Sequence, residues 1–241
     1  MSGSAANRDG AGGAAGDLET ATMRQSVRRY DIAIHGHGML PGLVALHLHN
    51  RAPDQALLLL SADPAIGGDA LEPVVRSSLS DSALDLVEPF AVARWPGFLV
   101  SDGGEPHHHD DEVLLLDPVQ LWLELSIALP LHDMVALDGP LVRQGKHLSW
   151  PSGSAQVTEL VDLAPATRQQ QSADILGLDA ARGLNLPVLA DFDTAGEPWD
   201  AFQHIPLGDE RVYVRKRRFR GNAYNELIGG FGKMLSDLIA Y

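Results

Sequence analysis

The chain has 241 residues, a net charge of −14 from 32 acidic and 18 basic side chains, and no cysteine. Its length allows one large or two small domains. The lack of cysteine excludes disulfides, thiolate metal sites and a cysteine nucleophile. The negative charge repels phosphate backbones, so no nucleic-acid partner is expected. No apolar run approaches the roughly 18–20 residues that span a bilayer, and no signal-peptide segment is evident. A cytoplasmic protein is expected.

The first part of the chain predicts a strand–helix–strand unit. Residues 1–26 are small and rich in glycine and alanine, which is typical of a disordered tail. An apolar strand is predicted at 31–35, and a helix follows at 40–50 with Pro41 in its first turn. The uninterrupted apolar run at 56–60 indicates a strand buried on both faces of a parallel sheet. Together these segments form one βαβ unit.

Beyond this unit the pattern predicts a mixed region and a closing helix. The expected elements are a helix at 84–94, a strand at 95–100, a polar loop at 101–112, a strand at 113–116 and a helix at 118–129 capped by Asp117. Short strands are predicted at 134–137, 141–143, 147–150, 155–162, 170–177 and 187–191, then a hairpin of 202–205 with 211–215. An amphipathic helix spans 225–240. The resulting division is a tail (1–26), a dinucleotide-binding-like segment (27–112), a mixed-sheet segment (113–220) and the final helix (221–241).

A glycine-rich turn lies between the first predicted strand and helix, where dinucleotide-binding proteins carry their fingerprint. Gly36 allows the tight turn, Gly38 lets the backbone approach a pyrophosphate, and Gly42 completes a GxGxxxG spacing. An acid that holds the ribose is expected at the end of the second strand. Ser61 stands there, with Asp63 two residues later. The turn predicts nucleotide binding through Gly36, Gly38, Gly42 and Ser61, and the alternative is a glycine turn that only packs the helix on the sheet.

Five ordered blocks of sequence resemble the bacterial lycopene β-cyclases. The blocks are the glycine turn through RAPD to the PAIGGD turn (residues 30–69), ARWPGF (93–98), VTELVDLAP (157–165), LPVLADFDT (186–194) and WDAFQHIPLGDERVYV (199–214). This resemblance implies a Rossmann-like FAD/NAD(P)-binding α/β domain with an interleaved antiparallel substrate-domain sheet. It also implies cyclisation of the ends of a lipophilic linear polyene with reduced FAD, with NAD(P)H as reductant. The candidate catalytic acids that it carries over are Asp162 and Asp191.

Some positions depart from the family's pattern. An acidic pair ends the family's catalytic hairpin, whereas this chain has Arg215 and Lys216, and arginine cannot serve as a proton donor near neutral pH. The family's third flavin-binding segment has no counterpart here. FAD binding is therefore expected to be weak or absent. The alternative function is a catalytically degenerate cyclase homologue that acts as a binding or assembly protein.

Three further clusters have both a functional and a structural interpretation. The run from His107 to His109 resembles a metal-binding cluster, but its glycine-rich setting favours a solvated loop, and no metal site is predicted. His37 either contacts a phosphate or is an exposed loop side chain. The basic residues Arg215, Lys216, Arg217 and Arg218 form either a membrane-surface or partner patch or a solvated strand edge. The apolar stripe of the final helix packs on the body of the protein or mediates homo-oligomerisation or partner binding.

Overall fold

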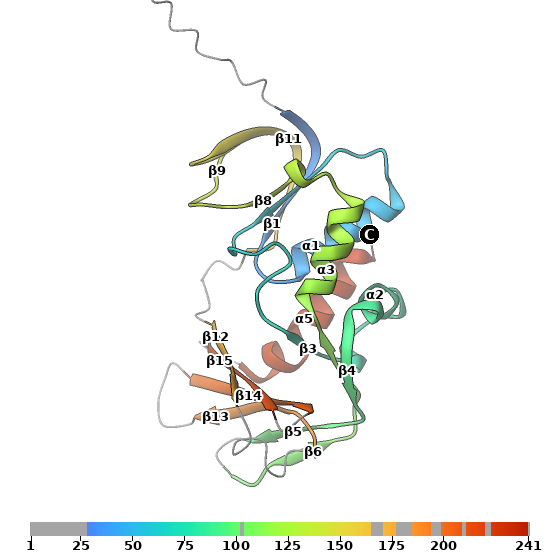
Figure 1. The fold of residues 1–241 in the computed structure, drawn as a ribbon, viewed down its shortest axis with the longest axis vertical. Helices are drawn as coiled ribbons and strands as arrows, with labels where there is room; N and C mark the ends of the chain where they lie inside the picture. Colours follow the sequence, from blue (N-terminus) through green and yellow to red (C-terminus); the bar gives the residue numbers. More distant parts are fainter. Residues whose placement is uncertain are drawn as a thin grey trace, which may run out of the picture.

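The computed structural model describes residues 28–101, 104–164, 171–176, 185–193, 199–208, 211–219 and 223–240. The predicted disordered tail at 1–26 lies outside the described residues. Within them, three sheets and several helices form an elongated molecule (Figure 1). Among the described residues, no helix is both long and apolar enough to cross a membrane.

The first sheet, sheet A, is built around β1 (Arg28–Gly36). Its parallel neighbours are β2 (Leu57–Ser61) and β11 (Gly153–Asp162), and β8 (Met134–Ala136) extends it in parallel beyond β2. At the other side, β10 (His147–Trp150) and β9 (Val142–Gln144) are antiparallel. The leucine run of β2 is apolar at every position because both faces are covered: Leu57 and Leu59 pack toward the helices, while Leu58 and Leu60 pack among residues of β10 and β11.

The three longest helices pack into the main core beside sheet A. They are α1 (Leu40–Arg51), α3 (Pro118–Ala128) and α5 (Ala223–Ile239). The predicted cap of α3 is confirmed, because the Asp117 carboxylate accepts a hydrogen bond from the Val119 N–H at 2.9 Å. In α5, Leu235 and Ile239 are buried in the main core. In this part of α5 the predicted apolar stripe therefore packs on the body of the protein.

The remaining strands form two more sheets. Sheet B has the order β3 (Glu72–Val75), β7 (Val113–Leu116) and β4 (Ala91–Trp95). Sheet C has the order β12 (Gln171–Leu176), β15 (Arg211–Phe219), β14 (Trp199–Gly208), β13 (Val188–Asp193), β5 (Phe98–Ser101) and β6 (His107–His109). The β14–β15 pair is the predicted hairpin, extended at both ends.

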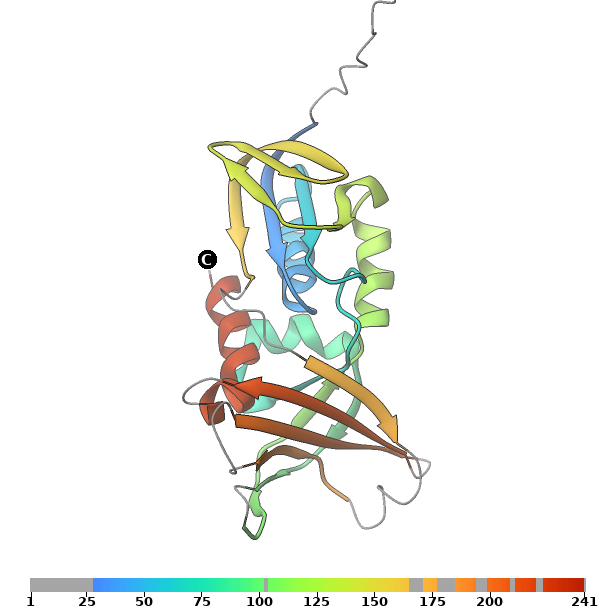
Figure 2. The same ribbon diagram turned by 90° about the vertical axis from the view of Figure 1, so that its left-hand side faces the viewer.

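The chain passes back and forth between the sheets. Sheet A takes its strands from residues 28–61 and 134–162, whereas sheets B and C take theirs from 72–116 and 171–219. Figure 2 shows sheet A at one end of the molecule, sheet C at the other, and α5 beside the junction. Helix α5 contacts α1, α2 (Asp81–Val87) and β3, and so joins both halves. The predicted α/β class with an interleaved antiparallel sheet is confirmed.

Three local predictions are wrong. The predicted strand at 95–100 is divided, since Trp95 ends β4 of sheet B and Phe98 begins β5 of sheet C. Instead of one helix at 84–94, α2 begins after Ser80, whose hydroxyl accepts the Ala83 N–H, and Pro89 lies in a following 3₁₀ turn before β4. Strand β4 forms because β7 offers it a pairing edge, which is a tertiary effect. The predicted polar loop at 101–112 contains β6, which pairs with β5, and the His109 ring stacks on Phe98 at 4.8 Å.

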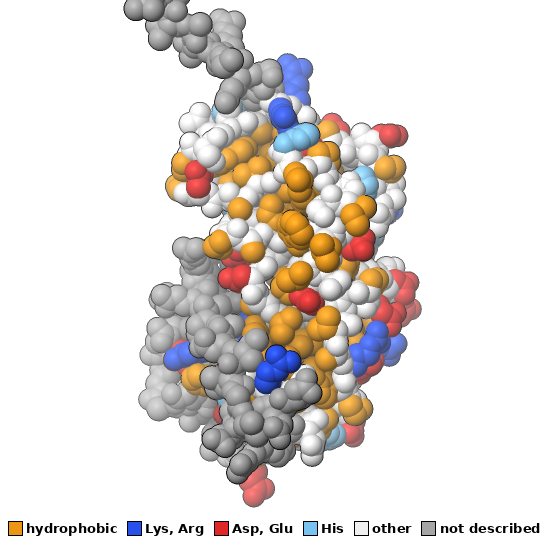
Figure 3. Space-filling view, viewed as in Figure 1, with side chains coloured by type: hydrophobic (Ala, Val, Ile, Leu, Met, Phe, Trp, Pro, Cys, Tyr) orange, Lys and Arg blue, Asp and Glu red, His pale blue; other side chains and the backbone are white. Residues whose placement is uncertain are grey.

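The outer face of α3 leaves a row of apolar side chains in solvent. Its members are Val119, Trp122, Leu123, Ile127 and, just beyond the helix, Leu131. Figure 3 shows hydrophobic side chains gathered along this side of the molecule. The inner face, with Leu121 and Leu125, is fully buried. Helix α3 therefore has an apolar character on both faces.

Candidate functional site

The predicted site residues of sheet A meet at one edge of that sheet. Strands β1, β2 and β11 are parallel, so their carboxyl ends lie side by side. The register pairs Gly36 with Ser61 and His35 with Asp162. Ligands of open α/β sheets bind at this kind of edge. The topology therefore brings Gly36, Ser61 and Asp162 together. The sequence had predicted this only for Gly36 and Ser61.

The glycines of the turn are required by close packing and by backbone conformation. A Cβ at Gly36 would lie 2.8 Å from Pro41 Cγ and 3.0 Å from Leu163 Cβ. Gly38 has a φ of +68°, a left-handed conformation that side chains disfavour. A Cβ at Gly42 would lie 2.9 Å from Leu125 Cδ1, so this glycine lets α1 approach α3. Each predicted glycine thus has its own steric reason.

The first turn of α1 has no side-chain cap. Its N-cap residue is Met39, no side chain hydrogen-bonds to the cap, and no acid lies in the first turn. The amino end of a helix carries a partial positive charge and unpaired N–H groups. This end of α1 therefore has the character of an anion-binding position, directly after the glycine turn.

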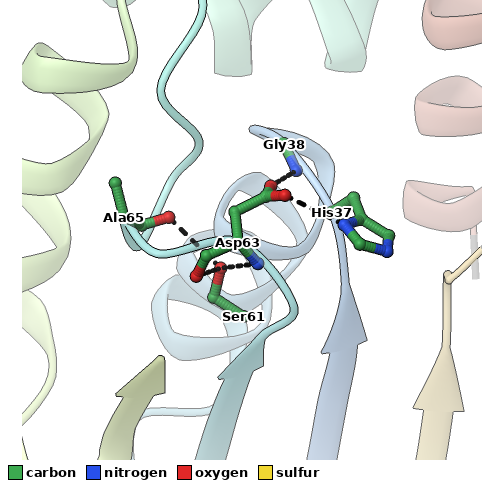
Figure 4. A network of polar contacts seen from close by, with 5 residues as sticks. All are labelled: His37, Gly38, Ser61, Asp63 and Ala65. Atoms are coloured by element: carbon green, nitrogen blue, oxygen red, sulfur yellow. Dashed lines mark hydrogen bonds and ion pairs between the residues drawn. The ribbon is translucent and has the colours of Figure 1, made fainter. Parts of the chain in front are cut away.

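A carboxylate from the loop after β2 lies on the turn. The Gly38 N–H donates to Asp63 Oδ2 at 2.6 Å, and His37 Nδ1 lies 2.9 Å from Asp63 Oδ1 (Figure 4). Both side chains are only partly exposed. His37, in the middle of the turn, is therefore held by a carboxylate rather than extending freely from a loop. Asp63 is positioned from two sides.

Ser61 holds the loop that carries Asp63. Its side chain is 3% exposed, and its Oγ accepts the Asp63 N–H at 3.2 Å. The same hydroxyl lies 3.2 Å from the carbonyl oxygens of Asp63 and Ala65 (Figure 4). The Ser61 hydroxyl thus donates within the loop, its single O–H facing two carbonyl oxygens, and uses one of its two acceptor positions on the Asp63 N–H. The loop conformation that brings Asp63 to Gly38 follows from these bonds.

The PAIGGD turn packs against the glycine turn. Gly67 and Gly68 have φ values of +88° and +93°. A Cβ at Gly68 would lie 3.0 Å from Gly38 Cα, and one at Gly67 would lie 3.3 Å from the Pro118 carbonyl oxygen. Both glycines therefore combine a positive φ with close approach of another backbone. The resemblance block at 30–69 is thus one continuous packed structure.

The two candidate acids lie in different sheets. Asp162, at the end of β11, has a side chain 56% exposed, and its Oδ1 lies 3.0 Å from His35 Nδ1. The same oxygen accepts the Ala164 N–H. Asp191 lies in β13 of sheet C, opposite Phe202 in β14 and Ser101 in β5, and is partly buried. The structure thus places Asp162 beside the glycine turn and Asp191 away from that edge, in sheet C.

The basic run begins inside the protein. Arg215 has a side chain 4% exposed, and its Nη1 donates to Glu72 Oε2 at 2.8 Å in β3. Lys216 is partly exposed, and its Nζ lies 2.7 Å from Asp200 Oδ2 and 5.2 Å from the Phe202 ring centroid. Arg215 therefore does not belong to the predicted surface patch, because its guanidinium is buried against Glu72, whereas Lys216, the next residue of the strand, points to the opposite face. The side chains of Arg217 and Arg218 lie outside the described residues.

The histidine run at 107–109 contacts protein groups. His107, His108 and His109 form β6, and His108 Nδ1 lies 3.2 Å from Asp110 Oδ1. In the part of the chain that the structure describes, no group of three or more histidine, cysteine, aspartate or glutamate residues is arranged to hold a metal ion. Successive residues of a strand face opposite sides, which separates adjacent histidines.

Sequence reasoning missed the roles of two acids. Asp63 was visible only as an acid two residues after the expected position, and its contact with Gly38 depends on the loop conformation. Glu72 gave no signal, because its partner Arg215 is 143 residues away in the chain. Only the packing of β3 beside β15 brings these two residues together.

Comparison with known proteins places this geometry in context. No family model matches the chain. It is 34% identical over 71 residues to lycopene beta-cyclase from Pantoea ananas, a segment covering 30% of this chain and 19% of that protein. Among solved structures, it resembles a geranylgeranyl bacteriochlorophyll reductase-like protein from Thermoplasma acidophilum (TM-score 0.51, 10% identity, 79% of this chain and 56% of that one).

A second similar structure is p-nitrophenol 4-monooxygenase from Pseudomonas putida, with a TM-score of 0.50, 13% identity, and coverage of 83% of this chain and 60% of that one. The chain thus spans somewhat more than half the length of these two structures. At such identities the likeness shows the fold alone: a Rossmann-like α/β fold of the flavoprotein type.

Proposed function

We propose that this chain is a lycopene cyclase-like flavoprotein that binds FAD at the glycine turn and acts on a lipophilic linear polyene. The observation that carries the proposal is the turn from Gly36 to Gly42, which leads into the uncapped amino end of α1. The cyclase alignment supports the same assignment.

The residues at the turn fit a dinucleotide cofactor. A diphosphate needs N–H donors, which the uncapped first turn of α1 offers, and room for a close approach. The space that a Gly38 side chain would fill is open, while the Gly38 N–H itself is taken by the Asp63 carboxylate. The carboxylate at the strand edge is also of the type that binds ribose hydroxyls. When bound, FAD supplies the redox chemistry of the site, and NAD(P)H is its proposed reductant.

Cyclisation of a polyene end requires a proton donor and stabilisation of a carbocation. The proposed acids are Asp162 and Asp191. Asp162 is oriented by its contact with His35 and lies beside the glycine turn. Asp191 is partly buried in the antiparallel sheet that serves as the proposed substrate domain.

A second candidate function is a catalytically degenerate relative that binds its ligand or a partner without turnover. The observation that favours it is the buried ion pair of Arg215 and Glu72. The resemblance puts an acid of the catalytic hairpin at Arg215. Here this position holds a cation whose charge is neutralised by Glu72, so the hairpin contributes no proton at that point.

FAD titration of the purified chain, followed by flavin fluorescence, tests the proposal. We expect a colourless preparation with weak, saturable FAD binding that Gly38→Val abolishes. Valine strains the left-handed backbone and fills the open space at the turn. Gly145→Val is the matched control, because Gly145 has a φ of +63°, equally open surroundings, and a place in the β9–β10 turn.

The outcomes separate the alternatives. Equal loss of binding in both glycine variants, or no binding by the wild type, contradicts the proposed site. If FAD binds, the complex with reduced FAD is tested for conversion of a linear polyene. Conversion that is slower in Asp162→Asn or Asp191→Asn supports the cyclase. FAD binding without conversion supports the degenerate relative. A stoichiometrically yellow preparation would contradict the weak binding and favour the active enzyme.

A further inference from the structure

We propose that the outer face of α3 is an interface between two copies of this chain, which pack their α3 helices antiparallel about a two-fold axis. This inference goes beyond the proposed function and does not depend on it, since it involves neither the glycine turn nor a nucleotide. Its starting point is the set of exposed side chains called here the α3 row: Val119, Trp122, Leu123, Ile127 and Leu131.

The α3 row is large for a surface that faces water. Ile127 is 80% exposed and Leu131 is 67% exposed, and Figure 3 shows hydrophobic side chains gathered along this side of the molecule. The five side chains together expose on the order of 500 Å² of apolar surface, a size that on a monomer often marks a binding surface. Two rows that face each other remove about 1,000 Å² from water, which is the size at which a specific protein interface begins.

The spacing of the α3 row fits a second copy of itself. Val119, Leu123 and Ile127 are four residues apart on the helix, so they form one ridge, and Leu131 follows at the same interval in the next turn. Ridges of this spacing interdigitate in the commonest class of helix packing. A two-fold axis at the midpoint of the row sets Leu123 of each copy against Ile127 of the other, and Val119 against Leu131. The row is therefore complementary to itself, as an isologous interface requires.

The charges at the two ends of the row favour the antiparallel arrangement. Asp117 caps the amino end of α3 and is partly exposed. At the carboxyl end, the Arg28 guanidinium and the His132 ring lie 3.5 Å and 3.3 Å from Asp133 Oδ1. The side chains of Arg28 and His132 are more than half exposed, whereas Asp133 is mostly buried, so the exposed groups of this end are basic. An antiparallel pair brings this end of each copy to Asp117 of the other, so groups of opposite charge meet twice.

A lipid surface fits the α3 row less well than a second copy does. Helices that lie on membranes are rich in lysine and arginine on their polar face. Helix α3 contains neither lysine nor arginine, and its one charged residue, Glu124, is exposed beside the row. Its charge pattern therefore lacks the attraction to anionic lipid that such helices use.

Sedimentation velocity over micromolar concentrations tests the interface. The wild type should form a dimer that dissociates on dilution. Leu123→Glu and Ile127→Lys should each raise the dimer dissociation constant roughly tenfold or more, because each variant sets two charges against apolar side chains of the other copy. Both side chains are exposed in the single chain, so the variants should remain folded, which thermal melting verifies.

A mixture of these two variants tests the register. In the mixed pair, the new carboxylate of one copy meets the new ammonium group of the other, and the second contact between Leu123 and Ile127 is unchanged. The mixture should therefore dimerise more tightly than either variant alone. Met234→Glu is the matched control, because Met234 is 46% exposed on α5, whose apolar stripe is the oligomerisation surface that the sequence suggested. This control should leave the dimer unchanged.

Each of the other outcomes overturns the proposal. A wild type that stays monomeric up to about 100 μM has no such interface of useful affinity. If this monomer binds vesicles of equal parts phosphatidylcholine and phosphatidylglycerol, and Leu123→Glu does not, the α3 row belongs to a lipid surface. A dimer that persists in both α3 variants, or that only Met234→Glu dissociates, lies elsewhere on the molecule. A mixture that dimerises no better than its components contradicts the antiparallel register.

Discussion

Removing only one partner of the buried ion pair between Arg215 and Glu72 should strongly lower the free energy of unfolding. Arg215 Nη1 lies 2.8 Å from Glu72 Oε2, and their side chains are 4% and 10% exposed. The same Nη1 lies 3.4 Å from the Leu71 carbonyl oxygen, and the Tyr213 hydroxyl donates to that carbonyl at 3.3 Å. These contacts tie β15 of sheet C to β3 of sheet B.

Replacing Glu72 by glutamine removes the negative charge that lies 2.8 Å from the buried Arg215 guanidinium. We expect a loss of about 3–5 kcal/mol in the free energy of unfolding, the usual cost of breaking a buried pair. This is a substantial part of the roughly 5–15 kcal/mol that stabilises a typical domain. The double variant Glu72→Met with Arg215→Met should recover most of the loss, because two apolar side chains of similar length carry no desolvation cost.

Urea denaturation of the wild type, Glu72→Gln and the double variant measures these energies, provided that the transition is two-state with an unchanged m-value. Lys233→Met is the control: the Lys233–Asp237 pair is 3.1 Å apart on α5, with both side chains mostly exposed, and should contribute at most about 0.5 kcal/mol. A loss under about 1 kcal/mol for Glu72→Gln would refute the reasoning. So would a double variant that is as unstable as Glu72→Gln.

Two further predictions concern α1. Burial, and to a lesser extent Arg51, lowers the pKa of His47, so protonation costs more in the folded than in the unfolded state. Stability should therefore be complete above about pH 6.5 and fall as the pH drops below it, and this decline should be smaller in His47→Leu when unfolding is measured at about pH 7.5 and 5.5. Gly42→Ala should cost about 1–2 kcal/mol by overpacking Leu125, after allowing for the higher helix propensity of alanine. In a Leu125→Ala background the cost of Gly42→Ala should fall, leaving only the close contact with Leu121 Cδ2 at 3.1 Å. An equal cost in both backgrounds would contradict the steric explanation.

The sequence by itself determined the parts of this protein that depend on local pattern. The four leucines of β2 can only be buried on both faces, Asp117 and Pro118 mark the start of α3, and the glycine spacing identifies the β1–α1 turn. Each of these follows from residues within a few positions of one another, so periodicity and steric rules are sufficient. The α/β class and the turn were therefore predictable.

Only the tertiary structure decided which distant residues meet. Strand β4 exists because β7 lies beside it, and Arg215 is buried because β3 brings Glu72 to it. Asp63 reaches Gly38 because the Ser61 hydroxyl folds the loop between them. A strand edge accepts any partner with free N–H and C=O groups, and a loop conformation depends on bonds to its own backbone, so neither leaves a periodic signal in the sequence. For this reason the contact between Asp63 and Gly38 became apparent only in the folded chain.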